Sequence, residues 1–129
     1  MRGVTHNGHE ALTLLERALQ LHGEFRRSLA PLRITPLQAG VILYLNRHGA
    51  AKLKDVAAAL SVTPATASQV MKDLVSKRWV TNQRVLHDDR ALSLQLSRQG
   101  ETLVRTLTDR VRSVRMANTA LITTMEKQK

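Results

Sequence analysis

The stretch that decides the fold covers residues 61–72 and reads Ser-Val-Thr-Pro-Ala-Thr-Ala-Ser-Gln-Val-Met-Lys. Thr63 followed by Pro64 is typical of a helix start, because a threonine side chain caps free N–H groups and proline suits the first helical position. Apolar residues then recur at helical spacing up to Leu74. A short helical pattern over residues 54–60 precedes this stretch, so the two predict a tight helix-turn-helix pair.

The hydrophobic period changes after this pair. Residues 79–86 read as a strand, His87-Asp88-Asp89 as a turn, and residues 91–97 alternate apolar and polar side chains. Two such strands predict a hairpin, and a hairpin directly after a helix-turn-helix predicts a winged helix-turn-helix. The expected fold class is therefore mainly α with a small β-hairpin wing.

Long amphipathic helical patterns flank this module, over residues 7–29 and 97–126. We expect residues 1–129 to form a single domain, in which residues 51–97 are the winged helix-turn-helix and residues 7–48 and 98–129 a helical dimerisation region. The apolar stripes could cover each other within one chain. We favour a homodimer, because two-fold dimers are the commonest oligomers and place two reader helices about one DNA turn apart on a near-palindromic site.

The charge balance points to a polyanionic partner. Twenty Lys and Arg stand against ten Asp and Glu, a formal charge of +10, and there is no cysteine among the 129 residues. The lack of cysteine excludes disulfides and thiolate metal sites. One Phe, one Tyr and one Trp offer little stacking surface for single-stranded nucleic acid, so duplex DNA fits better, although a basic but inert surface is the simpler alternative. No membrane span or signal peptide is recognisable, and a cytoplasmic location is expected.

The exposed face of the second helix of the pair is small and polar. Short side chains let a helix approach the major groove, hydroxyls bond base edges or phosphates, and glutamine pairs with adenine through two hydrogen bonds. The same face would also suit a protein, so a winged-helix module for protein–protein interaction without sequence-specific DNA binding stays open as the alternative. The candidate DNA-binding residues of the pair are Lys54, Thr63, Pro64, Ala65, Thr66, Ser68, Gln69 and Lys72.

The hairpin adds candidate DNA contacts. Arg90 is expected at the tip of the wing, where a narrow minor groove attracts a guanidinium group, and Arg84 lies on the same hairpin. Asp88 is expected to pair with Arg90 and hold it in place. A plain polar turn with an incidental ion pair is the alternative.

Signals for catalysis, metals and cofactors are weak. The five histidines show no metal-ligand spacing beside carboxylates, and there is no glycine-rich phosphate loop. We therefore expect no catalytic residue, no metal and no cofactor.

Taken together, these segments resemble the MarR family of transcriptional regulators over nearly the whole chain. Residues 35–43 look like the family's threonine-started second helix, and residues 55–74 match its helix-turn-helix. The run Asp88-Asp89-Arg90, followed by Leu96-Ser97 and Gly100, resembles the family's wing signature. Among the departures, Lys77-Arg78-Trp79 stands where a glycine-containing link is usual, and Ser97 stands where threonine is usual.

The resemblance implies a homodimer that binds a pseudo-palindromic operator and usually acts as a repressor. It also implies release by a small anionic or aromatic ligand that binds between the dimerisation helices and the winged module. His22, Arg26 and Tyr44 are the candidate ligand contacts, with packing or surface roles as the alternative.

Overall fold

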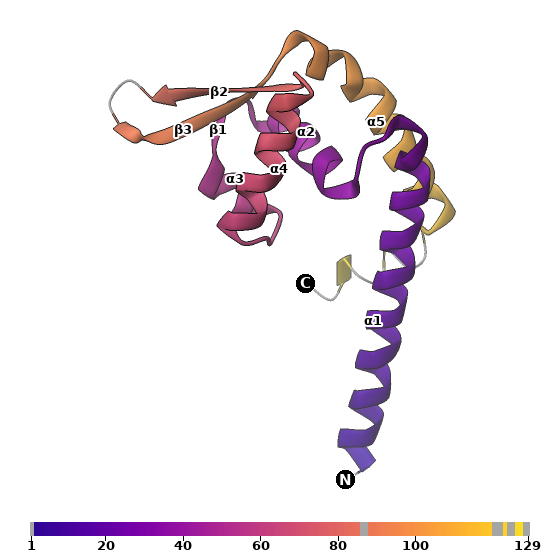
Figure 1. The fold of residues 1–129 in the computed structure, drawn as a ribbon. Helices are drawn as coiled ribbons and strands as arrows, with labels where there is room; N and C mark the ends of the chain where they lie inside the picture. The colour runs from indigo at the N-terminus through magenta and orange to yellow at the C-terminus, as the bar shows by residue number, and fades with distance from the viewer. Residues whose placement is uncertain (1, 86–87, 120–122, 124–125, 128–129) are drawn as a thin grey trace. The chain divides into compact units, whose positions relative to one another are not determined.

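The computed structural model describes the backbone of residues 2–85, 88–119, 123 and 126–127, and the side chains of residues 8–83, 93–119, 123 and 126–127. It groups the chain into two compact units, residues 1–33 with 110–129 and residues 34–109. Figure 1 shows the elements in chain order. They are α1 (Arg2–Leu29), the short 3-10 helix η1 (Ala30–Leu32), α2 (Pro36–His48), β1 (Ala51–Lys52), α3 (Leu53–Ala59), α4 (Pro64–Ser76), β2 (Val80–Val85), β3 (Asp88–Leu96) and α5 (Arg98–Ala117).

Two helices of the 34–109 unit begin in the way the sequence predicts. Thr35 caps α2 by accepting a hydrogen bond from the backbone N–H of Gln38, whose side-chain oxygen accepts one from the Thr35 N–H in return. Thr63 caps α4 by accepting from the N–H of Thr66. Proline follows each threonine at the first helical position. These caps fix where both helices start.

The core of the 34–109 unit comes from helices and sheet alike. Ile42 of α2, Leu74 of α4 and Leu94 of β3 have no exposed surface. The helical period of α4 is confirmed, because its predicted apolar stripe of Ala67, Val70, Met71 and Leu74 is buried.

The wing is a three-stranded sheet in the order β1-β3-β2, and this extends the predicted hairpin. The third strand, β1, pairs Ala51 and Lys52 with Leu94 and Ser93. A strand of two residues is too short to show an alternating pattern, so the sequence did not indicate it. The mainly helical fold class with a β wing is confirmed.

The predicted turn at His87-Asp88-Asp89 is wrong for its two aspartates, because β3 already begins at Asp88. The register between β2 and β3 shifts between Arg84 and Val85, and Val85 pairs with Asp88. This irregularity lets the strand start earlier than the charge pattern indicates. His87 lies outside the described residues.

The other unit contains α1 and the C-terminal part of α5. The Ser28 hydroxyl donates to the carbonyl of Arg110, and the Arg110 guanidinium donates to the carbonyl of Ser28, both at 3.4 Å. Four residues earlier on α1 and directly after the end of α5, the Asn118 amide donates to the Glu24 carboxylate. Both predicted helix bounds change, since α1 begins at Arg2 and α5 ends at Ala117.

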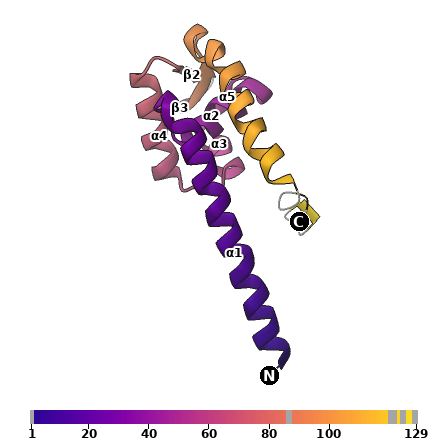
Figure 2. The ribbon, with the colours of Figure 1, turned by 90° about the vertical axis from the view of Figure 1, so that its right-hand side faces the viewer.

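Large apolar side chains of this unit face solvent. Leu12, Leu15 and Leu19 of α1 are 54%, 54% and 62% exposed, and Met116 of α5 is 72% exposed. The N-terminal half of α1 extends beyond the end of α5 in both views (Figures 1 and 2). The three leucines recur every three or four residues, so they share one face of the helix.

Candidate nucleic-acid interface

The first turn of α4 is held by a compact set of hydroxyl contacts. The Thr63 hydroxyl accepts from the Thr66 N–H at 3.1 Å and donates to the Thr66 hydroxyl at 3.0 Å. Thr63, Pro64, Ala65 and Thr66 are all exposed. The start of the helix therefore offers solvent a rigid, small and polar surface that a DNA groove could approach closely.

The rest of the predicted reader face follows from the helical period. Gln69 and Lys72 are exposed and Ser68 is half-buried, while the opposite side of the helix is buried in the core. With the first turn, they form a continuous exposed strip along α4, which we call the reader face (Thr63–Thr66, Ser68, Gln69 and Lys72). Lys54 is exposed in the first turn of the preceding helix, α3.

Asp73 is a feature of this face that the sequence analysis missed. The Gln69 side-chain amide donates to the Asp73 carboxylate at 3.2 Å, and both residues are exposed. The Gln69 side-chain oxygen takes no part in this contact. The signal was present in the sequence, because residues four apart on a helix are neighbours.

The candidate residues of the wing lie outside the described side chains. Arg84 belongs to β2, where its backbone pairs with Leu92, and Asp88 and Arg90 belong to β3. The predicted support of Arg90 by Asp88 stays a prediction.

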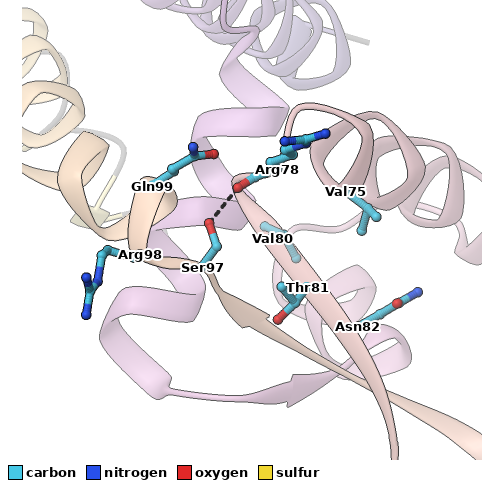
Figure 3. A pocket seen from close by; sticks show the side chains of 8 residues that line it. All are labelled: Val75, Arg78, Val80, Thr81, Asn82, Ser97, Arg98 and Gln99. Carbon is cyan, nitrogen blue, oxygen red and sulfur yellow. Dashed lines mark hydrogen bonds between the residues drawn. The ribbon is translucent and has the colours of Figure 1, made fainter.

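A groove opens behind the base of the wing, as Figure 3 shows. It has a volume of about 530 Å³ and lies between the end of α4, the start of β2 and the start of α5. Ser97 and Arg78, which are joined by a hydrogen bond, belong to its lining. The residues around the groove are Val75, Arg78, Val80, Thr81, Asn82, Ser97, Arg98 and Gln99.

The three candidate ligand contacts are divided between the two units. His22 and Arg26 are exposed on α1, and Arg26 borders a shallow groove of about 410 Å³ that also includes Leu19 and Arg27. Tyr44 lies in the 34–109 unit, half-buried, with its ring 4.3 Å from the ring of His48. A shared ligand site for the three stays a prediction.

The described part of the chain contains neither a metal-binding cluster nor a membrane-spanning helix. No group of three or more His, Asp or Glu side chains there could hold a metal ion. None of the helices described is both long and apolar enough to cross a membrane.

Comparisons with known proteins find a family model that matches part of the chain. The model of the MarR family matches residues 34–91, which include α2, the helix-turn-helix and most of the wing. No curated protein sequence matches the chain.

Solved structures share the fold along nearly the full chain. BpsR of Bordetella bronchiseptica, described as regulated in its DNA binding by 6-hydroxynicotinic acid, has a TM-score of 0.80 and 22% identity, covering 92% of this chain and 98% of its own. AbfR bound to DNA has a TM-score of 0.82 and 18% identity, covering 98% and 93%. A mutant of MarR from E. coli complexed with operator DNA has a TM-score of 0.76 and 18% identity, covering 98% and 92%. The winged helix-turn-helix at residues 34–91 is therefore similar to the MarR family, and the chain as a whole shares its fold with these structures.

Proposed function

We propose that this protein is a dimeric, sequence-specific DNA-binding transcriptional regulator, which represses by occupying a promoter. The observation that carries the proposal is the reader face of α4, which is exposed, small and capped by Thr63 at its first turn. Two solved structures that share this fold are described as bound to DNA. We infer that the protein has no catalytic activity and acts in the cytoplasm.

The proposed contacts follow from this face and from the wing. In each half-site, α4 enters the major groove with Thr66, Ser68 and Gln69 toward base edges, while Lys54 and Lys72 contact phosphates. Arg84 and Arg90 of the wing reach the flanking backbone and minor groove, with Asp88 orienting Arg90. The remaining proposed contacts come from the first turn of α4: Thr63, Pro64 and Ala65.

The homodimer is supported by the exposed leucines of α1. Leu12, Leu15 and Leu19 leave an apolar stripe on α1 that water covers in a single chain, and Met116 of α5 is exposed as well. A second copy would bury this stripe in an isologous interface. Such a dimer presents two readers to a pseudo-palindromic operator.

Selection of bound sites from random duplexes tests the proposal directly. We expect enriched sites with two inverted half-sites about one helical turn apart. Binding should weaken steeply with salt, in proportion to the phosphates that the protein neutralises. A winged-helix module that binds proteins would enrich no sequence, and this outcome would favour the alternative function.

Two matched variants test the reader face. Lys72→Ala should weaken binding to all duplexes and lower the salt slope by about one. Arg105→Ala removes an equal charge from the exposed surface of α5 and should leave the slope unchanged. Equal effects of the two variants would show that binding depends on overall charge, and α4 would then lose its role.

Asp73→Asn tests whether Asp73 lies close to DNA. The substitution removes a negative charge from a surface that approaches phosphates, so binding to every duplex should tighten several-fold. Glu101→Gln, a matched change on α5, should have little effect. Unchanged binding by Asp73→Asn, measured by fluorescence anisotropy, would place Asp73 away from DNA.

A small anionic or aromatic effector is also proposed. The groove beside Arg26 and Arg27 on α1 offers positive charge next to the apolar side chain of Leu19, although His22 does not border it. Such a ligand releases DNA only if it binds the DNA-free form more tightly. Hydroxybenzoate should then weaken operator binding by the protein but not by Arg26→Ala.

A further inference from the structure

The start of α5 is joined to the end of α4 by direct hydrogen bonds. The Ser97 hydroxyl donates to the carbonyl of Arg78 at 2.6 Å, which Figure 3 marks, and accepts from the backbone N–H of Gly100 at 3.0 Å. The backbone N–H of Ser97 donates to the carbonyl of Trp79 at 3.1 Å. One side chain therefore caps α5 and also holds the turn that follows α4.

Gly100 allows this contact to be very close. A Cβ atom added at Gly100 would lie 2.1 Å from the carbonyl oxygen of Trp79, a distance that real Cβ atoms do not reach. The first turn of α5 therefore packs directly against the backbone of Trp79, in the turn that follows α4. A larger residue would force the two apart.

Backbone hydrogen bonds also join this turn, at Arg78 and Trp79, to α4. The N–H groups of Arg78 and Trp79 donate to the carbonyls of Val75 and Leu74, at 3.0 and 3.1 Å. Arg78 has a φ of 65°, in the left-handed region. Leu74 is fully buried, so the reader helix, the turn and the start of α5 form a single rigid node.

Helix α5 then continues without a break to Ala117 and contributes to both compact units. A helix of 20 residues is about 30 Å long, so a change of about 10° at its start moves its end by about 5 Å. That displacement exceeds the rise of one base pair, about 3.4 Å. The direction of α5 at Ser97 therefore has consequences at the scale of operator spacing.

We propose that the α4–α5 clasp, formed by Arg78, Trp79, Ser97 and Gly100, sets the half-site spacing that the dimer accepts, with Ser97 as its positioning residue. The inference rests on the proposed function, because it concerns two readers held in one dimer. It assigns spacing specificity to a hydroxyl group that lies outside the reader face and directly after the last strand of the wing.

Two substitutions at Ser97 separate the clasp from ordinary helix capping. Ser97→Asp keeps the cap, because a carboxylate accepts from the Gly100 N–H, but it cannot donate to the Arg78 carbonyl. Ser97→Thr keeps both hydrogen bonds. A purely structural cap would be rescued by aspartate, whereas the clasp requires a donor.

The first measurement needs no DNA. The chain has no cysteine, so Ala58→Cys on the exposed side of α3 gives one spin label per protomer. Pulsed electron resonance then reports the distance between the two winged helices of a dimer. We expect a narrow distribution for the unsubstituted background and for Ser97→Thr, and a broadened or shifted one for Ser97→Asp. An unchanged distribution for Ser97→Asp would overturn the proposal.

The second measurement uses a selected operator and versions lengthened or shortened by one base pair between half-sites. The wild-type protein and Ser97→Thr should prefer the selected spacing by tenfold or more, and Ser97→Asp should discriminate by less than about twofold. Uniform weakening at all spacings would assign Ser97 a structural role only. If the wild-type protein binds no duplex, the proposed function fails while the distance measurement still decides the clasp. Should Ser97→Asp not fold, Gly100→Ala tests the same contact by steric pressure.

Discussion

The two compact units differ in how completely a single chain can bury them. Residues 34–109 have a closed core, in which Ile42, Leu74 and Leu94 are fully buried. The unit formed by residues 1–33 and 110–129 leaves Leu12, Leu15 and Leu19 more than half exposed. The first unit buries its core within one chain, and the second leaves three leucines of one helix face open to solvent.

Charge sharpens this contrast. Residues 1–33 and 110–129, the helical unit, carry ten basic and four acidic side chains, a net charge of +6. Residues 34–109, the larger reader unit, carry ten basic and six acidic side chains, a net charge of +4. The excess charge is therefore not concentrated where the DNA contacts are proposed. Specific binding must depend on the shape and polarity of α4 as well as on charge.

Introducing a charge into the apolar stripe should have the largest effect. Leu15→Glu places a carboxylate at a position that a second copy would bury, so we expect a monomer. Loss of the second reader should lower operator affinity by about 10²–10⁴-fold. Sedimentation velocity and anisotropy measure the two effects.

Thr13→Glu is the matched control for that experiment. Thr13 is exposed on the same helix, away from the leucine stripe, and the change in charge is identical. It should leave a DNA-binding dimer. If both variants stay dimeric, the stripe is not the interface.

Truncating a leucine should lower the free energy of unfolding by different amounts in the two units. Leu74→Ala should lower the free energy of unfolding of the reader unit by about 2–5 kcal/mol, because it leaves a cavity in a closed core. Leu15→Ala should change it by less than about 0.5 kcal/mol at concentrations where the chain is monomeric. Trp79, the single tryptophan, lies in the reader unit and reports its unfolding in urea. Equal decreases in the free energy of unfolding for Leu74→Ala and Leu15→Ala would contradict this difference between the two units.

The two threonine caps offer a comparison inside the reader unit. Thr63→Ala and Thr35→Ala should each lower the free energy of unfolding by about 1 kcal/mol. Only Thr63→Ala frays the first turn of the reader face, so it should weaken operator binding beyond its effect on stability. Thr63→Ser should keep both the stability and the operator affinity of the unsubstituted protein. Equal losses of affinity from the two alanine variants would contradict a special role for α4.

The smallest expected effect is a gain of stability. Arg78 adopts a left-handed conformation that is unfavourable by about 1–2 kcal/mol for an L-residue. Arg78→Gly relieves it but adds freedom to the unfolded chain, so we expect a net gain of about 0.5–1 kcal/mol in thermal or urea unfolding. Ser76→Gly, in the last turn of α4, should instead lose about 0.5 kcal/mol. A loss from Arg78→Gly would show that the arginine side chain stabilises the turn.

The sequence predicted the helices and the exposed face of α4 well because their signals are local. A threonine before a proline and an apolar period of three to four residues sufficed to place α2 and α4 and to bury Leu74. The contacts that sequence reasoning missed join residues distant in the chain or depend on register. Strand β1 forms only against β3, and the start of β3 at Asp88 depends on a register shift.

The candidate site was predictable to the same extent. The exposed face of α4 follows from helical geometry. The pairing of Gln69 with Asp73 depends on side-chain rotamers, and the contact from Ser97 to Arg78 depends on the tertiary fold. Arg78 in place of a glycine was a visible clue to a left-handed turn. No local pattern indicated what that turn touches.

The division of the chain also has a consequence for its synthesis. The reader unit is continuous, from residue 34 to residue 109, whereas Ser28 and Glu24 of α1 hydrogen-bond with residues 110 and 118. At about 5–20 residues per second, roughly 5–20 s pass between the emergence of α1 and that of its partners. During that interval the leucines of α1 stay uncovered, and the reader unit is completed only when residue 109 emerges, just before these partners. Nascent chains on neighbouring ribosomes could therefore meet through α1 before either is finished.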